Sequence, residues 1–509
     1  MTNRHFSALN GSNENLSPSA SHLMAIRGFG RIHHIEIANA ELEKALVAID
    51  LIDADWLTQA ARNEKLFSLE SEEDRREAWN EYREKIRKGE QIENPFENAP
   101  IFRIEFEESR AQLNQNLSIT LNDTEDFSEL TREMESQWIE LYISNSPNDG
   151  ITGLLYVSFL AEPIRVFAKG EQLPQEKNDA LSQLFTLEHL KKIDQTGLGS
   201  RISESTPAYL AAYDVGQGNS NALLDNDGLP WLYYDLGAGV YQNKKTRPAN
   251  LHFCFSKKPC ILLSHWDTDH WAGAYIPVAS YTPSPLSLDW IAPNQIVTPH
   301  HLVFAFDIFA NGGNLFIYPG ASGSILKINA SNFSYTLAVG NGPDRNSTGI
   351  VFAVEDYANS DVPQRSWLLT GDCSYSYFLP AIGIAPPVAL IVPHHGAQLH
   401  GPTPPPPPHS GNYRRLIYSY GKNNKHGSAG VRHPTAGCVQ AHIIQNWNHW
   451  AWVPANAGYP PPPGGDVRPT CLHTPGSFPG GVLIGWQGPP ALIPPLCSGT
   501  ICNAPLNKI

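Results

Sequence analysis

The chain has 509 residues, of which 41% are hydrophobic and 17% charged, and its formal net charge is −14. This length predicts two or three domains. No apolar run reaches the ~18 residues that a membrane helix needs, so we expect no membrane partner, and the N-terminus lacks the pattern of a secretory signal. The negative charge argues against a basic protein that wraps nucleic acid. Seven cysteines without a CxxC pair favour reduced thiols and a cytoplasmic protein.

Charge and proline are distributed unevenly along the chain. Residues 1–200 contain 35 of the 50 acidic and 20 of the 36 basic side chains, whereas 36 of the 42 prolines and all seven cysteines follow residue 200. Such a change in composition predicts a domain boundary near 195–206. We therefore expect an acidic domain over 1–200, a second domain over 201–440, and a Pro/Gly/Trp-rich extension over 441–509 that packs on the second domain.

The first domain is predicted to be helix-rich α+β. Charge pairs at helical spacing favour helices, and alternating or continuous apolar runs favour strands. Helices are expected at 38–66, 70–90, 129–141 and 179–192, and strands at 101–106 and 151–160. The paired His33-His34 is interpreted as solvated or capping. The pattern shows no catalytic constellation here, so this domain either recognises a partner protein or a substrate, or covers the site of the other domain.

After residue 206, short apolar strands end in polar side chains. Two early strands end at Asp214 and Asp235, a weak signal that a plain hairpin would also explain. The segment 261–273 (ILLSHWDTDHWAG) is stronger, because a strand leads directly into four residues able to bind metal. Imidazoles and carboxylates are ligands of borderline and hard divalent ions. These four are His265, Asp267, Asp269 and His270.

Two further strands carry the same signature in order. Residues 366–372 (SWLLTGD) end in Asp372, and residues 389–396 (ALIVPHHG) end in His394 and His395. Side chains at the ends of buried strands are held by a rigid backbone, while the loops leave room for a substrate.

Together these segments resemble the metallo-β-lactamase superfamily, and within it the soluble hydrolase domain of the ComEC-like DNA-uptake competence proteins. The motifs DVGQGNS, SHWDTDHWAG, LLTGD, VPHHG and YGKNNKHGSAGVRHP occur in that branch's order, across residues 207–436. The resemblance implies an αββα sandwich with a dinuclear metal site at one edge of its sheets. The expected fold class is therefore α+β, with this sandwich preceded by the helix-rich acidic domain.

The resemblance also implies roles for individual residues. His265 and Asp267 would hold one ion, Asp269, His270 and His394 the other, and Asp372 would bridge them. Asp214 would orient a ligand histidine by a hydrogen bond. Most of the superfamily has histidine at the position of Asp267, and a further ligand histidine has no match in 341–348, where Asn346 or Ser347 occupies that place. Two Zn²⁺ or Mn²⁺ ions are the expected cofactors, because this ligand set is rich in carboxylates.

Paired divalent ions favour hydrolysis of a phosphodiester by a hydroxide held between them. Asp269 and Asp372 would serve this chemistry, His433 could donate a proton or hydrogen bond, and His395 has either a supporting or a structural role. Basic side chains near these motifs could hold a phosphate backbone, or merely solubilise a loop. They are Arg414, Arg415, Lys422, Lys425 and Arg432.

The predicted function is a metal-dependent phosphodiesterase or nuclease acting on DNA or RNA. One alternative is hydrolysis of a small phosphodiester, a cyclic nucleotide or another ester. The other is an effector subunit, recruited by a protein partner through residues 1–200, by analogy with bacterial defence systems. A salt-sensitive affinity for polynucleotides would separate the first two, and cleavage by the isolated protein would exclude obligate dependence on a partner.

Overall fold

The computed structural model describes residues 2–6, 25–39, 44–119, 132–249, 251, 253–276, 283–358, 360, 362–426, 432–450, 452, 465–471, 480–490 and 507–508. The chain forms two compact units. The first unit comprises residues 1–191, 295–315 and 425–431, and the second comprises 192–294, 316–424 and 432–509. Two short segments from the C-terminal half thus belong to the first unit, which the composition did not indicate.

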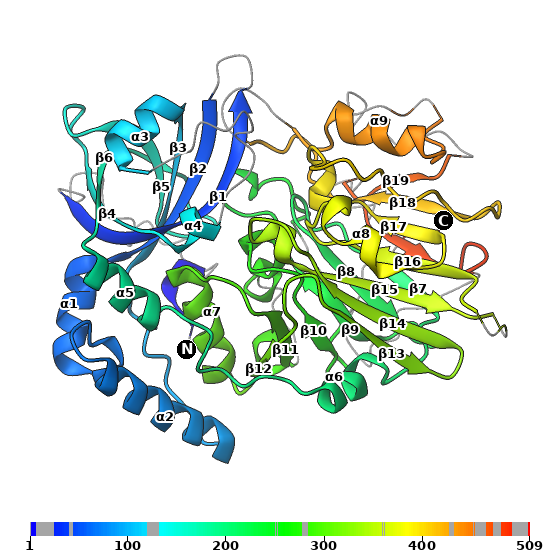
Figure 1. Cartoon of the computed structure of the whole chain (residues 1–509), viewed down its shortest axis with the longest axis horizontal. Helices are drawn as coiled ribbons and strands as arrows, with labels where there is room; N and C mark the ends of the chain where they lie inside the picture. The colour runs from blue at the N-terminus through cyan, green and yellow to red at the C-terminus, as the bar shows by residue number, and fades with distance from the viewer. Residues whose placement is uncertain are drawn as a thin grey trace. The chain divides into compact units, whose positions relative to one another are not determined.

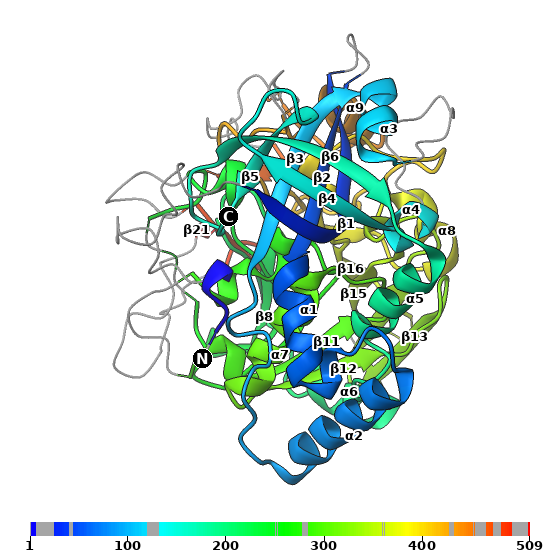
Figure 2. The same ribbon diagram turned by 90° about the vertical axis from the view of Figure 1, so that its left-hand side faces the viewer.

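A closed six-stranded barrel dominates the first unit (Figures 1 and 2). All its strand pairs are antiparallel, and its interior is filled by apolar side chains such as Ile49, Phe106 and Leu141. The strands, in barrel order, are β1 (Ile26–Asn39), β2 (Lys44–Asp53), β3 (Ile101–Ser109), β5 (Ile151–Tyr156), β6 (Ile164–Gln172) and β4 (Trp138–Ser144).

The expected helix over 38–66 is therefore wrong in its first half, where β2 lies. The run ALVAIDLI has nearly continuous burial, which suits a strand covered on both sides, and β-branched residues favour that state. The helix expected over 129–141 is present as α4 over Arg132–Ser136, whereas β4 begins at Trp138, and residues 129–131 lie outside the described residues. The strand beginning at Ile101 is present as β3.

Several helices of this unit begin or end at residues with recognisable capping signals. In α2, Ser71 accepts a hydrogen bond from Asp74 N and Gly89 ends the helix in the left-handed conformation. The helices of this unit are α1 (Ala54–Asn63), α2 (Glu72–Lys88), α3 (Arg110–Leu117), α4 (Arg132–Ser136), α5 (Gln175–Leu184) and α7 (Pro299–Ala310).

His33 is buried rather than solvated, so that interpretation is wrong. Its Nδ1 lies 3.0 Å from Asp50 Oδ2, and Arg103 Nε donates to Asp50 Oδ1 at 2.9 Å. Thr298 Oγ1 donates to the same carboxylate at 2.8 Å. A fully buried carboxylate is thus stabilised by several donors, as burial of a charge requires.

Two sheets with a common core form the second unit. Tyr234 of one sheet stacks on Phe352 of the other, and its hydroxyl donates to Ile350 O at 2.6 Å. The eight-stranded sheet has the order β12 (Asn314–Tyr318), β11 (Asp289–Pro293), β10 (Cys260–Leu262), β9 (Pro230–Leu236), β8 (Ser220–Leu224), β7 (Tyr209–Ala212), β20 (Val482–Ile484) and β21 (Asn507–Lys508).

The seven-stranded sheet buries its second face under further apolar side chains, including Val439 of α9 (Ala436–Ile444). Helices α6 (Gln195–Ile202) and α8 (Leu379–Ile382) complete the unit. The sheet has the order β13 (Ile325–Ala330), β14 (Phe333–Val339), β15 (Ile350–Asp356), β16 (Arg365–Leu369), β17 (Pro387–Ile391), β18 (Arg415–Tyr418) and β19 (Val467–Pro469). In this way β19 and β20, from the C-terminal extension, each join a sheet.

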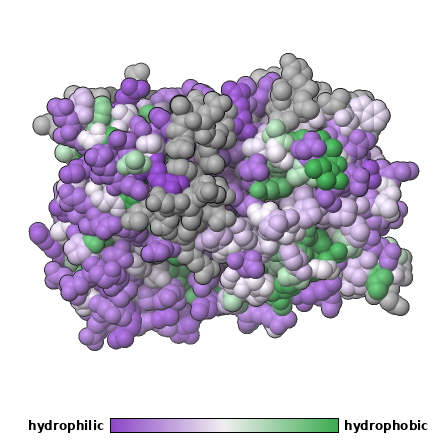
Figure 3. Space-filling model, turned by 45° about the horizontal axis from the view of Figure 1, so that its top comes forward, coloured by the Kyte–Doolittle hydropathy of each residue, from purple (hydrophilic) through white to green (hydrophobic). Residues whose placement is uncertain are grey.

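The surface of the protein is largely polar on the face drawn in Figure 3, with smaller hydrophobic patches. In the described residues, no helix combines the length and apolar character needed to cross a membrane.

Cys254 is disulfide-bonded, so the expectation of thiols alone is wrong at this position. Among the described cysteines, Cys260, Cys373, Cys438 and Cys471 are free.

Candidate metal centre

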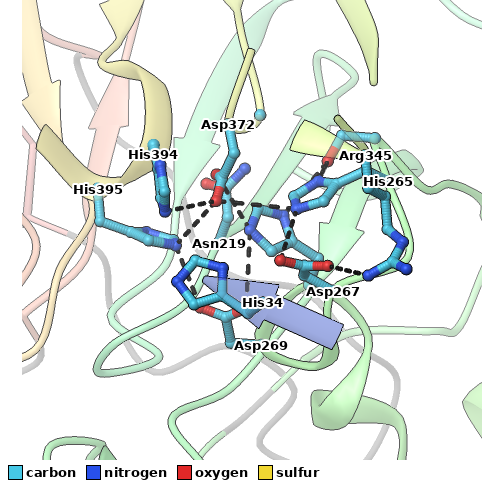
Figure 4. Close-up of polar contacts among 12 residues, drawn as sticks. His34, Asn219, His265, Asp267, Asp269, Arg345, Asp372, His394 and His395 are labelled. Carbon is cyan, nitrogen blue, oxygen red and sulfur yellow. Dashed lines mark hydrogen bonds and ion pairs between the residues drawn. The ribbon is translucent and has the colours of Figure 1, made fainter. Parts of the chain in front are cut away.

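The candidate ligands follow the carboxyl ends of strands in the second unit. β10 runs parallel to β9, and β16 runs parallel to β17. Because the carboxyl ends of neighbouring parallel strands meet at one edge of a sheet, Asp372 and His395 come together after β16 and β17. His265 follows β10 of the other sheet, and its Nε2 lies 3.8 Å from Asp372 Oδ2. Figure 4 shows these side chains pointing toward a common centre.

Two overlapping groups of three ligand atoms form this centre. His265, His270 and Asp372 make one group, and Asp269, His270 and His395 make the other. His270 Nε2 lies 3.1 Å from Asp372 Oδ1, and His395 Nε2 lies 3.2 Å from Asp269 Oδ2. The two groups share His270, so the ligand atoms form one continuous site.

Each of the three histidines is held at Nδ1 and directs Nε2 into the centre. His270 Nδ1 donates to Asp235 Oδ2 at 2.8 Å, and His395 Nδ1 donates to the Ser419 carbonyl at 2.8 Å. His265 Nδ1 donates to Ser264 Oγ at 3.0 Å, and that hydroxyl donates in turn to Asp235. A neutral imidazole with its proton on Nδ1 presents the Nε2 lone pair, which is the form that binds metal.

The buried atoms of this centre fit a divalent cation. Within the described part of the chain, no hydrogen bond is made by the Nε2 atoms of His265, His270 and His395 or by Asp372 Oδ1. Buried polar atoms without partners are costly in a folded protein, so their convergence calls for an explanation. A bound divalent ion would satisfy all four, and nitrogen and carboxylate donors suit zinc or manganese.

Asp235 is the functional residue that the sequence interpretation passed over. It is fully buried and accepts hydrogen bonds from Asn219 Nδ2 at 2.8 Å and Ser264 N at 2.7 Å, besides that from His270. It thereby orients His270, the task expected of Asp214. Asp214 accepts from Gly216 N at 3.2 Å, and its role toward a ligand remains a prediction. The strand-end position of Asp235 was the available signal.

The two neighbouring histidines differ in how they face the centre. His395, expected to support or to play a structural role, belongs to a ligand group, whereas His394, expected as a ligand, belongs to neither. His394 Nε2 lies 3.7 Å from Asp372 Oδ2. Both residues have positive φ, 49° and 54°, which non-glycine residues rarely adopt. Such strained backbone is typical of functional sites.

Asp267 has a different partner from the other carboxylates. Arg345 Nη1 donates to Asp267 Oδ1 at 3.2 Å, while Asp267 Oδ2 lies 3.7 Å from His265 Nε2 (Figure 4). Asn346 and Ser347, which were expected in this neighbourhood, form a 3₁₀ turn just after Arg345. Sequence reasoning reached the correct loop but did not select its arginine.

Carboxylates and imidazoles of the centre shift one another's pKa values. Burial favours the neutral form of Asp372, but the surrounding histidines outweigh it and hold the pKa of this carboxyl well below its usual value. Burial likewise opposes protonation of His270, yet Asp372 and Asp235 raise its pKa well above 6.5. The same balance lowers the pKa of Asp269 and raises that of His395. Asp269 and Asp372 are therefore anionic, as metal ligands must be.

His433 lies beside this centre. Its ring centroid is 5.4 Å from that of His394, and Gln217 Nε2 donates to its Nδ1 at 3.4 Å. An amide nitrogen only donates, so Nδ1 accepts and the proton of a neutral His433 ring lies on Nε2. His433 N also donates to Asn424 Oδ1 at 3.0 Å, which fixes its backbone.

Two of the basic residues proposed for phosphate binding lie away from the strand ends that carry the ligands. Arg414 and Arg415 lie at the start of β18, whereas the ligand-bearing loops follow strand ends. Arg414 pairs with Asp466 at 2.8 Å, and Arg415 lies over the Tyr413 ring, so assigning these two to phosphate is wrong. Lys422 and Arg432 are exposed and remain predictions, as does Lys425, which belongs to the first unit.

The first unit contains another group of potential ligands, His33, Asp50 and His301. Its chemistry is less suited to a cation, because Arg103 already neutralises Asp50. His301 Nδ1 accepts a hydrogen bond from Thr298 N at 3.0 Å, which places the proton of the neutral ring on Nε2. We therefore interpret this group as a buried polar network.

A scan against models of known protein families found no match, and no curated protein sequence matches this chain.

Proposed function

We propose that the second unit is a metal-dependent hydrolase, and that its substrate is a phosphodiester in DNA or RNA. The observation that carries this proposal is the convergence of four buried atoms without hydrogen-bond partners, from His265, His270, His395 and Asp372. Asp269 and Asp267 add carboxylate oxygens beside them. The resemblance of the sequence motifs to the ComEC-like branch of the metallo-β-lactamases supports the same reaction class.

Zn²⁺ or Mn²⁺ at these residues would supply Lewis acidity and lower the pKa of a water toward 7. The chain's own residues provide the surroundings for that chemistry. Asp235, Ser264 and Ser419 hold the three imidazoles in the metal-binding tautomer. His433, whose ring lies 5.4 Å from that of His394, could donate its Nε2 proton to the leaving oxygen.

Two alternatives share this centre. A small phosphodiester or cyclic nucleotide would use the same ligands without a long basic surface, and the contacts of Arg414 with Asp466 and of Arg415 with Tyr413 favour this smaller substrate. In the other alternative, the first unit recruits a partner and the hydrolase acts only within that complex, as an effector of a bacterial defence system would. This second alternative rests on analogy.

The test compares the protein loaded with Mn²⁺ or Zn²⁺ with the Asp269→Ala/His270→Ala variant. Labelled linear, circular and single-stranded DNA, RNA and a chromogenic small phosphodiester are offered separately. We expect cleavage of a nucleic acid by the native protein and loss of at least ~100-fold in the variant. Asp227→Asn, on an exposed turn of the same unit, should retain full activity. Cleavage of the small phosphodiester alone would favour the first alternative, and no cleavage with either metal would contradict the proposal.

A further inference from the structure

We infer that Arg345 makes the metal centre asymmetric, so that it holds one divalent ion tightly and a second ion only weakly. This inference rests on the proposed metal centre and concerns the number of ions it retains. The motif resemblance implied two metal positions, with Asp267 as a ligand of one of them. In the structure, Asp267 contacts both a guanidinium and a ligand histidine.

Arg345 is an unusual neighbour for a metal position. Its side chain is 2% exposed and reaches Asp267 Oδ1 at 3.2 Å. Because a guanidinium keeps its charge at every accessible pH, it is a permanent cation beside this carboxylate. A charge buried at that depth is weakly screened, so it repels a second cation strongly.

The backbone holds Arg345 firmly in this place. Asp344 accepts a hydrogen bond from Ser347 N at 2.7 Å and, through its carbonyl, from Thr348 Oγ1 at 2.8 Å. Two residues later, Ile350 N donates to Ser264 O at 2.7 Å, which ties this loop to the residue before His265. The main chain that carries Arg345 is therefore fixed relative to the ligands, and the contact with Asp267 places its guanidinium.

The two sides of the centre consequently differ. Asp269, His270 and His395 surround one position with Asp372 beside them, and both imidazoles are oriented through Nδ1. On the other side, Asp267 can offer only Oδ2, since Oδ1 is bound by Arg345. We assign the tight ion to the first position.

The experiment measures the number of bound ions and the affinity of each. Metal-free protein is titrated with Mn²⁺ by calorimetry, and the loaded protein is examined by electron paramagnetic resonance, which distinguishes isolated from coupled Mn²⁺. We expect one tight ion in the native protein, with a signal of isolated Mn²⁺. Arg345→Gln should raise the affinity for the second ion ~10-fold or more and produce a coupled signal. Arg345→Lys keeps the charge and should resemble the native protein.

Asp267→Asn provides a second measurement that does not depend on the folding of an arginine variant. This variant should bind the tight ion with an affinity within about twofold of the native value, and it should not bind the second ion. Two equally tight ions in the native protein would overturn the inference, as would an Arg345→Gln variant that remains folded yet binds the second ion no better. Protein that binds two tight ions and hydrolyses a phosphodiester would leave the proposed function intact. Protein that binds no ion would contradict both.

Discussion

Asp235 Oδ2 accepts a hydrogen bond of 2.8 Å from His270 Nδ1, and both side chains are fully buried. His270 belongs to both groups of ligand atoms, so this bond orients the residue that connects them. A carboxylate in this position fixes the tautomer of a ligand histidine and increases its basicity. The affinity for metal therefore depends on a residue that does not itself face the ion.

Asp235→Asn tests this dependence. The amide lacks the charge that holds the imidazole, and it leaves one of the buried donors at Ser264 or Asn219 without an acceptor. We expect metal affinity to fall ~10- to 100-fold and stability to fall by about 1–3 kcal/mol. Calorimetric titration with Zn²⁺ and thermal unfolding measure the two effects. The same substitution at exposed Asp227 is the control, and unchanged affinity in Asp235→Asn would refute the orienting role.

The two consecutive histidines allow a comparison within one turn. His395 Nε2 lies 3.2 Å from Asp269 and its Nδ1 is bound by the Ser419 carbonyl, whereas His394 is 3.7 Å from Asp372. His395→Ala should reduce metal affinity at least ~10-fold, and His394→Ala should reduce it less. Metal titration of the two variants measures the difference. A larger loss in His394→Ala would restore the assignment that the motif resemblance implied.

We expect stability and metal binding to depend on close backbone packing at Gly237. A Cβ at this position would lie 1.8 Å from the Asp269 carbonyl oxygen and 2.5 Å from that of Asn219. Both obstacles are backbone atoms, so Gly237→Ala must displace the loop that carries Asp269. We expect a loss of stability of about 1–3 kcal/mol, with weaker metal binding. Gly199→Ala, in α6, is the matched control, because within 4 Å its Cβ would meet Ile328 Cγ2 at 3.9 Å, and it should leave metal binding unchanged without lowering stability.

The sequence predicted what local patterns determine. Metal-competent side chains at strand ends were recognisable because an apolar run directly precedes each of them. Asp235 and Arg345 were missed because their roles depend on partners 35 and 78 residues away, His270 and Asp267. The fold of the first unit was mispredicted for a similar reason. β2 contains residues that also suit a helix, and its pairing with β1 and β3 decides its conformation.

The buried histidines of the first unit predict sensitivity to acid. His5 Nδ1 donates to the Ile101 carbonyl at 3.0 Å, and its Nε2 lies 3.1 Å from His300 Nε2. Burial lowers the pKa of His5 to about 3, with Arg103 adding to the shift and Asp50 opposing it. Burial also lowers the pKa of His300 well below 6.5. Both rings are therefore neutral in the folded protein over a pH range in which the unfolded chain binds protons.

The direction of the effect follows from that difference. Between pH 6.5 and about 3, the unfolded state takes up a proton at His5 that the folded state does not, so stability falls as the pH falls. Each such histidine contributes a slope of about 1.4 kcal/mol per pH unit. Urea denaturation at pH 7, 6 and 5 should show this loss of unfolding free energy. Below pH 6.5, the dependence of the unfolding free energy on pH should be weaker in His5→Gln by about the slope of one histidine. Equal slopes in the two proteins would mean that His5 is protonated in the folded state.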